Sequence, residues 1–191
     1  MTLRLLPVLA SALALTAAPA LPAFAQAPQK LVAGKSQIRF AFRQMNVPVE
    51  GRFREFDATV QFDPAKPEAT RAAFEVDLAS IDLGSAEGET EARRKPWLFV
   101  ESFPKARFVA ASVRATGPGR FQATGPLTIK GVTQDITAAF SVEDEGGLRT
   151  VEGQFPLRRL QFRIGDGPWS DTDTVADEVT VRFRFAIAVK P

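Results

Sequence analysis

Carboxylates are the side chains of this sequence whose grouping could support chemistry. They gather in two stretches, the first with Asp77, Asp82, Glu87, Glu89 and Glu91 and the second with Asp166, Asp171, Asp173, Asp177 and Glu178. Two carboxylates across a bond could hydrolyse a glycoside, and several around one loop could hold calcium. The spacing selects no acid–base pair in the first stretch, and the second does not follow the EF-hand pattern. We expect solvated acidic segments, with no metal and no catalytic residue.

The missing residue types restrict the chemistry further. The 191 residues include no Cys, no His and no Tyr. A thiolate nucleophile, a disulfide, a Ser-His-Asp triad and a histidine-ligated metal are therefore excluded. The sequence also lacks a phosphate-binding P-loop, a dinucleotide-binding glycine motif after a strand, and the G-x-S-x-G elbow of hydrolases. The protein is predicted not to be an enzyme, and no cofactor is expected.

Charge gives one further candidate for an interaction. Lys and Arg number 24 against 22 Asp and Glu, a net charge of +2, and this balance argues against nucleic-acid binding. A local basic run, Arg93-Arg94-Lys95, precedes Trp97-Leu98-Phe99. Such a run is either the solvated C-terminal end of a helix or a transient contact with anionic lipid head groups at a membrane.

The first 25 residues have the features of an export signal. Arg4 provides a positive start, a short leucine-rich run follows, and Ala23-Phe24-Ala25 is an A-x-A cleavage site. Three prolines interrupt the segment, which argues against a retained transmembrane helix. We expect cleavage after Ala25, so that residues 26–191 form the mature protein, and we expect it in the periplasm.

Apolar and polar residues alternate through most of the mature chain. This period of two predicts about nine or ten strands, each with one buried face, in a single domain over 26–191. One such strand is expected through Leu160, Phe162 and Ile164. The apolar phase shifts near Arg54-Glu55, which predicts a bulge or corner there. The one helical candidate covers 86–95 and ends at Pro96.

An all-β chain of this kind folds as a sandwich or a closed barrel, and a barrel of about eight strands either is filled by side chains or holds one small ligand. The inward positions are unusually bulky because the sequence contains 16 Phe and 2 Trp. An aromatic interior suits a branched apolar chain that offers almost no hydrogen bonds. The residues expected to line such a tunnel are Phe40, Phe42, Phe53, Phe62, Phe74, Trp97, Phe108, Phe121, Leu127, Ile129, Phe140, Phe155, Phe162, Trp169, Phe183 and Phe185. Plain core packing is the alternative for each of them.

Five segments, in order along the chain, carry a family resemblance. They are KSQIRF at 35–40, VPVEGRFREF at 47–56, VDLASIDLG at 76–84, FPKARF at 103–108 and GPLTIKGVT at 125–133. Together they resemble the YceI family of bacterial exported proteins. That resemblance implies an extended lipocalin-like antiparallel β-barrel with one short α-helix beside it. It also implies a long internal tunnel that holds a polyisoprenoid or similar lipid.

A later segment, IGDGPWSDTDTVADEV at 164–179, resembles a branch of this family that is associated with cytochrome b561-type membrane proteins. This implies an isoprenoid quinone as the ligand and such a membrane protein as a possible partner. The resemblance to the family as a whole implies a possible homodimer. The stretch at 88–92 lacks the Arg-Asp and His that many members carry, so no head-group contact of that His carries over. We expect periplasmic, non-catalytic lipid binding and transport. The alternative is a filled barrel that acts as an envelope-stress or membrane-redox interaction protein.

Overall fold

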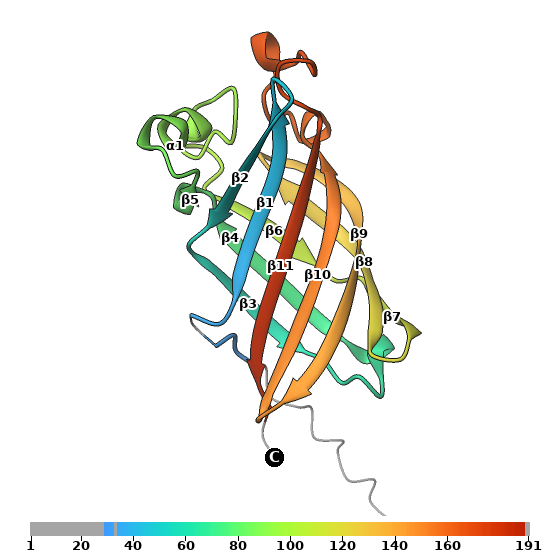
Figure 1. The fold of residues 1–191 in the computed structure, drawn as a ribbon. Helices are drawn as coiled ribbons and strands as arrows, with labels where there is room; N and C mark the ends of the chain where they lie inside the picture. The colour runs from blue at the N-terminus through green and yellow to red at the C-terminus, as the bar shows by residue number, and fades with distance from the viewer. Residues whose placement is uncertain (1–28, 33, 190–191) are drawn as a thin grey trace, which may run out of the picture.

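A computed structural model describes residues 29–32 and 34–189, and the expected signal peptide at 1–25 lies outside them. These residues form one antiparallel sheet of eleven strands with one α-helix (Figure 1). The strands are β1 (Gln37–Gln44), β2 (Val47–Phe53), β3 (Phe56–Gln61), β4 (Arg71–Asp77), β5 (Ile81–Asp82), β6 (Lys105–Val109), β7 (Ser112–Gly117), β8 (Arg120–Ile129), β9 (Val132–Glu145), β10 (Leu148–Arg158) and β11 (Glu178–Ala188). No described helix is long and apolar enough to span a bilayer.

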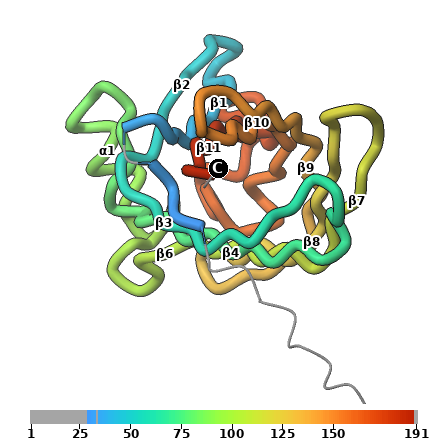
Figure 2. Tube along the Cα trace, turned by 90° about the horizontal axis from the view of Figure 1, so that it is seen from below, coloured from blue at the N-terminus to red at the C-terminus, as the bar shows by residue number. Residues whose placement is uncertain are grey.

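The strands pair in the order β3-β4-β6-β8-β9-β10-β11-β1-β2-β5, with β7 added beside β8. The sheet curls strongly on itself, so that its first and last strands approach one another around a common interior (Figures 1 and 2). Alternating side chains of every strand therefore point inward. The predicted all-β, lipocalin-like architecture is confirmed, with eleven strands where the alternation predicted nine or ten.

The helix and one expected strand differ in detail from the prediction. Helix α1 (Ala86–Arg93) begins where predicted, with the Ser85 hydroxyl accepting a hydrogen bond from the Gly88 amide, and ends two residues earlier than expected. The strand expected through 160–164 is wrong. Strand β10 ends at Arg158, and the chain turns into a 3-10 helix, η3 (Arg159–Phe162), because the Arg159 side chain is buried and binds the loop that follows.

The predicted corner lies between Phe53, where β2 ends, and Phe56, where β3 begins. Three ionic groups hold it. The Asp82 carboxylate of β5 accepts from Arg52 Nε at 2.8 Å and from Arg54 Nε at 3.1 Å. These contacts attach the end of β2 and the corner itself to β5.

We predict that Asp82→Asn lowers the melting temperature in a pH-dependent way. The hydrogen bond from Arg52, the amide of Gly84 and the hydrogen bond from Arg54 lower the pKa of Asp82 from its ordinary 3.8 to about 2. Its stabilising contribution is therefore complete above pH 4 and is lost as the pH falls through about 2. Thermal unfolding should show a gap between wild type and variant at pH 6 that shrinks toward pH 2. Asp135→Asn, on the exposed side of β9, is the control.

The lower edge of the sheet is completed by the N-terminal segment at 29–32. The Gln29 amide donates to the Val60 carbonyl of β3 at 2.7 Å, and the Val32 amide donates to the Ala186 carbonyl of β11 at 2.7 Å. The segment thus lies between β3 and β11, where these two strands do not pair directly. In this way the curled sheet surrounds its interior at that edge.

Candidate ligand cavity

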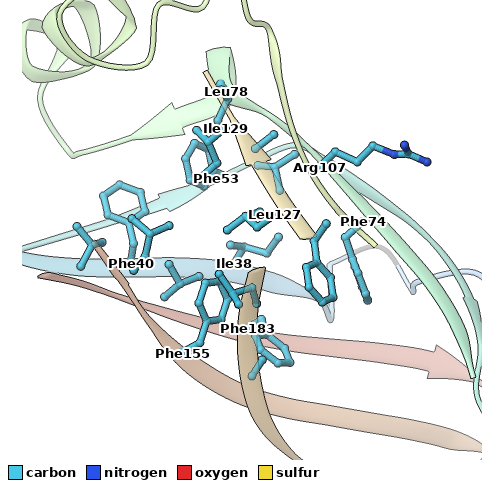
Figure 3. Close-up of a pocket in the computed structure, with 18 of the residues that line it drawn as sticks. Ile38, Phe40, Phe53, Phe74, Leu78, Arg107, Leu127, Ile129, Phe155 and Phe183 are labelled. Carbon is cyan, nitrogen blue, oxygen red and sulfur yellow. The ribbon is translucent and has the colours of Figure 1, made fainter. Parts of the chain in front are cut away.

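The concave side of the sheet encloses a cavity of about 440 Å³. This volume falls within the range of roughly 300–1,000 Å³ that is typical of ligand pockets. All eleven strands contribute residues to its wall, β5 through Ile81. Figure 3 shows aliphatic and aromatic side chains converging on this space from several strands.

Most residues predicted to line a tunnel lie on the wall of this cavity. These fourteen are Phe40, Phe42, Phe53, Phe62, Phe74, Trp97, Phe108, Leu127, Ile129, Phe140, Phe155, Trp169, Phe183 and Phe185. Phe121 and Phe162 are not on the wall. Phe121 is buried beside Phe62 and Phe140, at ring distances of 5.3 Å and 5.5 Å, and Phe162 is buried in the core because η3 replaces the expected strand.

Sequence reasoning from the aromatic residues missed other parts of the wall. Aliphatic residues in the same inward phase also line the cavity, among them Ile38, Val60, Ile136 and Val181. The alternation that marked the phenylalanines could have found them. Arg159 also lies on the wall, where it continues the inward phase of Phe155 and Leu157.

Several inward phenylalanines are only partly covered by other protein atoms. Phe40, Phe74, Phe108, Phe155 and Phe183 are only half-buried, although they lie on the cavity wall. Figure 3 shows Phe40, Phe74, Phe155 and Phe183 directed toward the space between the strands. In a filled core such rings would be packed on all sides, so the interior has room for an apolar occupant.

Two glycines allow this space to remain open. Gly51 is paired with Phe40 across β1 and β2, and Gly153 with Phe183 across β10 and β11. A Cβ atom at Gly51 would lie 2.3 Å from Phe40 Cζ, and one at Gly153 would lie 2.5 Å from Phe183 Cζ. Each ring therefore lies over the missing side chain of its cross-strand partner, against the wall and away from the centre.

We predict that Gly51→Ala narrows the cavity and weakens binding of an apolar ligand by about tenfold, which corresponds to roughly two buried methylene groups. The groups in its way are ends of side chains, Phe40 and Leu83 Cδ2, so the Phe40 ring can move without a change in the backbone. Titration with an isoprenoid quinone measures the effect. Gly51→Ala combined with Phe40→Leu should restore affinity, and equal affinity of Gly51→Ala and wild type would contradict this role.

The few ionic groups on the wall are already engaged. The Arg107 side chain is 60% exposed and lies 3.8 Å from Glu75, and its guanidinium points away from the cavity (Figure 3). Glu91 forms an ion pair with Arg94 at 3.0 Å. Arg159 donates only to backbone carbonyls. The wall thus presents no free charge to an occupant among the described residues, and its chemistry suits an apolar chain.

One end of the cavity, here called the tryptophan end, is covered by Trp97 and Trp169, whose rings lie 5.4 Å apart. Arg159 organises it. This residue is 2% exposed, its guanidinium lies 5.8 Å from the Trp97 ring, and burial lowers its pKa while Asp177 and Asp171 oppose that shift. Its five N–H groups bind the carbonyl oxygens of Ala176, Ile164, Gly165, Trp169 and Val175.

A buried lysine fixes the same end from the other side. Lys130 Nζ donates to the Pro96 carbonyl at 3.1 Å and to the Arg163 carbonyl at 2.5 Å, with Asp166 at 3.7 Å. Burial lowers the pKa of Lys130, and Asp166 opposes that shift. Lys130 and Arg159 thus attach the loops that carry Trp97 and Trp169 to the barrel.

Phenylalanines pack together at the opposite end. Phe62 packs against Phe121 at 5.3 Å and Phe140 at 6.0 Å. Arg149 lies over the Phe62 ring at 5.7 Å, donates to the Phe62 carbonyl at 3.0 Å, and forms two 2.7 Å hydrogen bonds with Asp144. The pKa of Asp144 is lowered by these hydrogen bonds. The Phe62 cluster and this ion pair cover the second end.

The charged segments singled out in the sequence lie mainly outside the cavity. Asp77 caps a turn by accepting from the Ala79 amide, and no three acidic side chains of the described chain converge as metal ligands. In the basic run, Arg93 donates to the Ala79 carbonyl at 3.0 Å, Arg94 pairs with Glu91, and Lys95 lies over the Phe99 ring. Each cation of the run therefore has a partner within the protein.

A curled antiparallel sheet around an apolar cavity, with aromatic side chains packed at both ends, defines a lipocalin-like barrel. The model of the YceI-like domain matches residues 30–187, and the chain belongs to this family. A UPF0312 protein of Pseudomonas syringae pv. syringae is 37% identical over 131 residues, which cover 65% of this chain and 68% of that protein. One from Azotobacter vinelandii is 38% identical over 120 residues, 60% of this chain and 62% of that protein.

Solved structures show the same fold. BcnA of Burkholderia cenocepacia has a TM-score of 0.80 and 37% sequence identity, covering 82% of this chain and 98% of that chain. A polyisoprenoid binding domain from Saccharophagus degradans, implicated in plant cell wall breakdown, has a TM-score of 0.68 and 13% identity over 85% of this chain and 98% of its own. At that identity, the second similarity concerns the fold alone.

Proposed function

We propose that this protein binds a long apolar lipid, a polyisoprenoid or the tail of an isoprenoid quinone, in its internal cavity without catalysing a reaction. The observation that carries the proposal is the set of inward phenylalanines that remain half-buried around an apolar space. Binding would remove both the lipid chain and these rings from water, which stabilises a complex by roughly 0.8 kcal/mol per buried CH₂. The polyisoprenoid binding domain with the same fold supports this ligand class.

We further propose that the protein is exported to the periplasm and carries its lipid to or from a membrane, which it contacts transiently. The export-signal features of residues 1–25 and the resemblance of 164–179 to the branch associated with cytochrome b561-type proteins support this role. A protein of that type is the proposed membrane partner, and a homodimer is the proposed assembly. The filled-barrel alternative has less support, because the half-buried rings leave space inside.

Native mass spectrometry of the protein purified from periplasm without detergent tests the proposal. We expect a stoichiometric adduct with the mass of an isoprenoid lipid, which solvent extraction would then identify. A bare polypeptide that takes up neither an added isoprenoid quinone nor an added polyprenol would overturn lipid binding. Recovery of the protein only from the cytoplasm would overturn the proposed export and leave the binding result to be judged separately.

A further inference from the structure

The hairpin between β1 and β2 carries two large apolar side chains that face solvent. Met45 is 74% exposed and Val47 is 62% exposed. They are the exposed large hydrophobic residues of the described chain. The hairpin projects at the same end of the barrel as the loop between β10 and β11 (Figure 1). Exposed apolar groups gathered at one tip indicate a contact surface more readily than single scattered residues do.

The backbone at this tip makes methionine an unfavourable choice. Met45 has φ 48° and Asn46 has φ 63°, so both central residues of the turn are left-handed. Two-residue hairpins of this kind favour Asn and Gly, and a bulky side chain there is strained. Met45 thus has an unfavourable backbone conformation and an apolar side chain exposed to solvent. A residue that violates two local preferences points to a function outside the fold.

The tip is connected directly to the tryptophan end of the cavity. The Met45 amide donates to the Thr174 carbonyl at 2.8 Å, and the Ala176 amide donates to the Arg43 carbonyl at 2.9 Å. Phe42 and Gln44 of the hairpin line the cavity, as do Trp169 and Val175 of the loop. A surface that engages the tip therefore lies beside the loop and strand that form this end of the cavity.

We propose that Met45 and Val47 insert into the surface of a lipid bilayer and place the tryptophan end of the cavity against the membrane. Two side chains cannot supply the roughly 800 Å² per partner of a standard protein interface, whereas a bilayer accepts a small apolar insertion without a matching surface. This goes beyond the proposed function by assigning the membrane contact to a site, and it does not depend on which lipid is carried.

The charges around the tip determine which membrane it suits. The Arg43 guanidinium is engaged by the Asn46 carbonyl at 3.1 Å and by Asn46 Oδ1 at 2.9 Å. Asp171 and Asp173 lie in the loop bonded to the hairpin. With an engaged cation and two carboxylates nearby, anionic lipids gain no advantage there. The contact is therefore apolar, and zwitterionic lipid suffices.

Flotation with phosphatidylcholine vesicles tests this contact directly. Met45→Asn with Val47→Thr should reduce the partition constant for vesicle binding by at least about tenfold, since two apolar side chains no longer leave water on binding. Met45→Leu with Val47→Ile keeps the apolar surface and should bind like wild type. Because Asn favours the left-handed turn, the polar variant should melt no lower than wild type. It should also bind an isoprenoid quinone, added without vesicles, as wild type does.

Three outcomes would overturn the assignment. The first is equal vesicle binding by the polar variant and wild type, or no binding by either. The second is binding that needs added phosphatidylglycerol and disappears in salt, which would move the contact to the basic run at 93–95. The third is a change of oligomeric state in the polar variant, which would make a second copy of the chain the occupant. If the wild-type protein does not bind the quinone, that result counts against the proposed function and leaves the vesicle result intact.

Discussion

Two carboxylates placed in the cavity wall, by Phe155→Asp and Phe183→Asp, should reduce uptake of an isoprenoid quinone by at least about 100-fold. Both rings lie on the wall and are half-buried. A bound apolar chain would displace the water around these carboxylates and leave both charges buried without partners. Burial of an unpaired charge costs several kcal/mol, and 100-fold corresponds to about 2.7 kcal/mol. Equilibrium titration of the purified variant measures the loss.

Controls on the same two strands separate the effect of a charge inside the cavity from the effect of a changed net charge. Gln154→Asp with Arg182→Gln changes the net charge by the same amount, but both residues are exposed on the outer face. This variant should bind normally. Phe155→Leu with Phe183→Leu keeps the wall apolar and should lose much less affinity. If the aspartate variant keeps its fold by circular dichroism and still takes up the quinone, the cavity is not the binding site.

Much of this arrangement is predictable from the sequence, because a strand places alternate residues on one face. The runs through Phe40 and Phe42, and through Phe183 and Phe185, identify wall residues by period alone. The phase shift between Phe53 and Phe56 likewise identifies the corner. These features depend only on local geometry, which the order of residues records.

The wrong predictions arise where a side chain changes the path of the backbone. The inward phase of Phe155 and Leu157 continues to Arg159, whereas the sequence predicts a new strand through Leu160, Phe162 and Ile164. In the structure Arg159 is inward and buried, and its hydrogen bonds to the loop require the turn that replaces the expected strand. The contact of 29–32 with β3 and β11 also has no local pattern, since it depends on main-chain hydrogen bonds across the sheet edge.

Arg159→Met should lower the free energy of unfolding by about 3–5 kcal/mol, because each of several buried carbonyls would lose a hydrogen bond worth about 1 kcal/mol. The five carbonyls that its guanidinium satisfies would lose their donor, and Arg159 is 2% exposed, so water does not readily replace it. Urea unfolding measures the change. Arg159→Lys should rescue only part of it, because an ammonium has three donors and no planar fork.

The neighbouring arginine provides the matched control. Arg158 is 62% exposed and lies 3.4 Å from Asp177, so Arg158→Met should cost no more than about 1 kcal/mol, as for other surface pairs. Arg159→Met should also speed dissociation of a bound quinone, because Trp169 and the Trp97 ring lose the group that holds them over the cavity end. Equal unfolding energies for the two variants would show that the loop keeps its position without Arg159. A destabilised variant with an unchanged dissociation rate would show that the lipid leaves elsewhere.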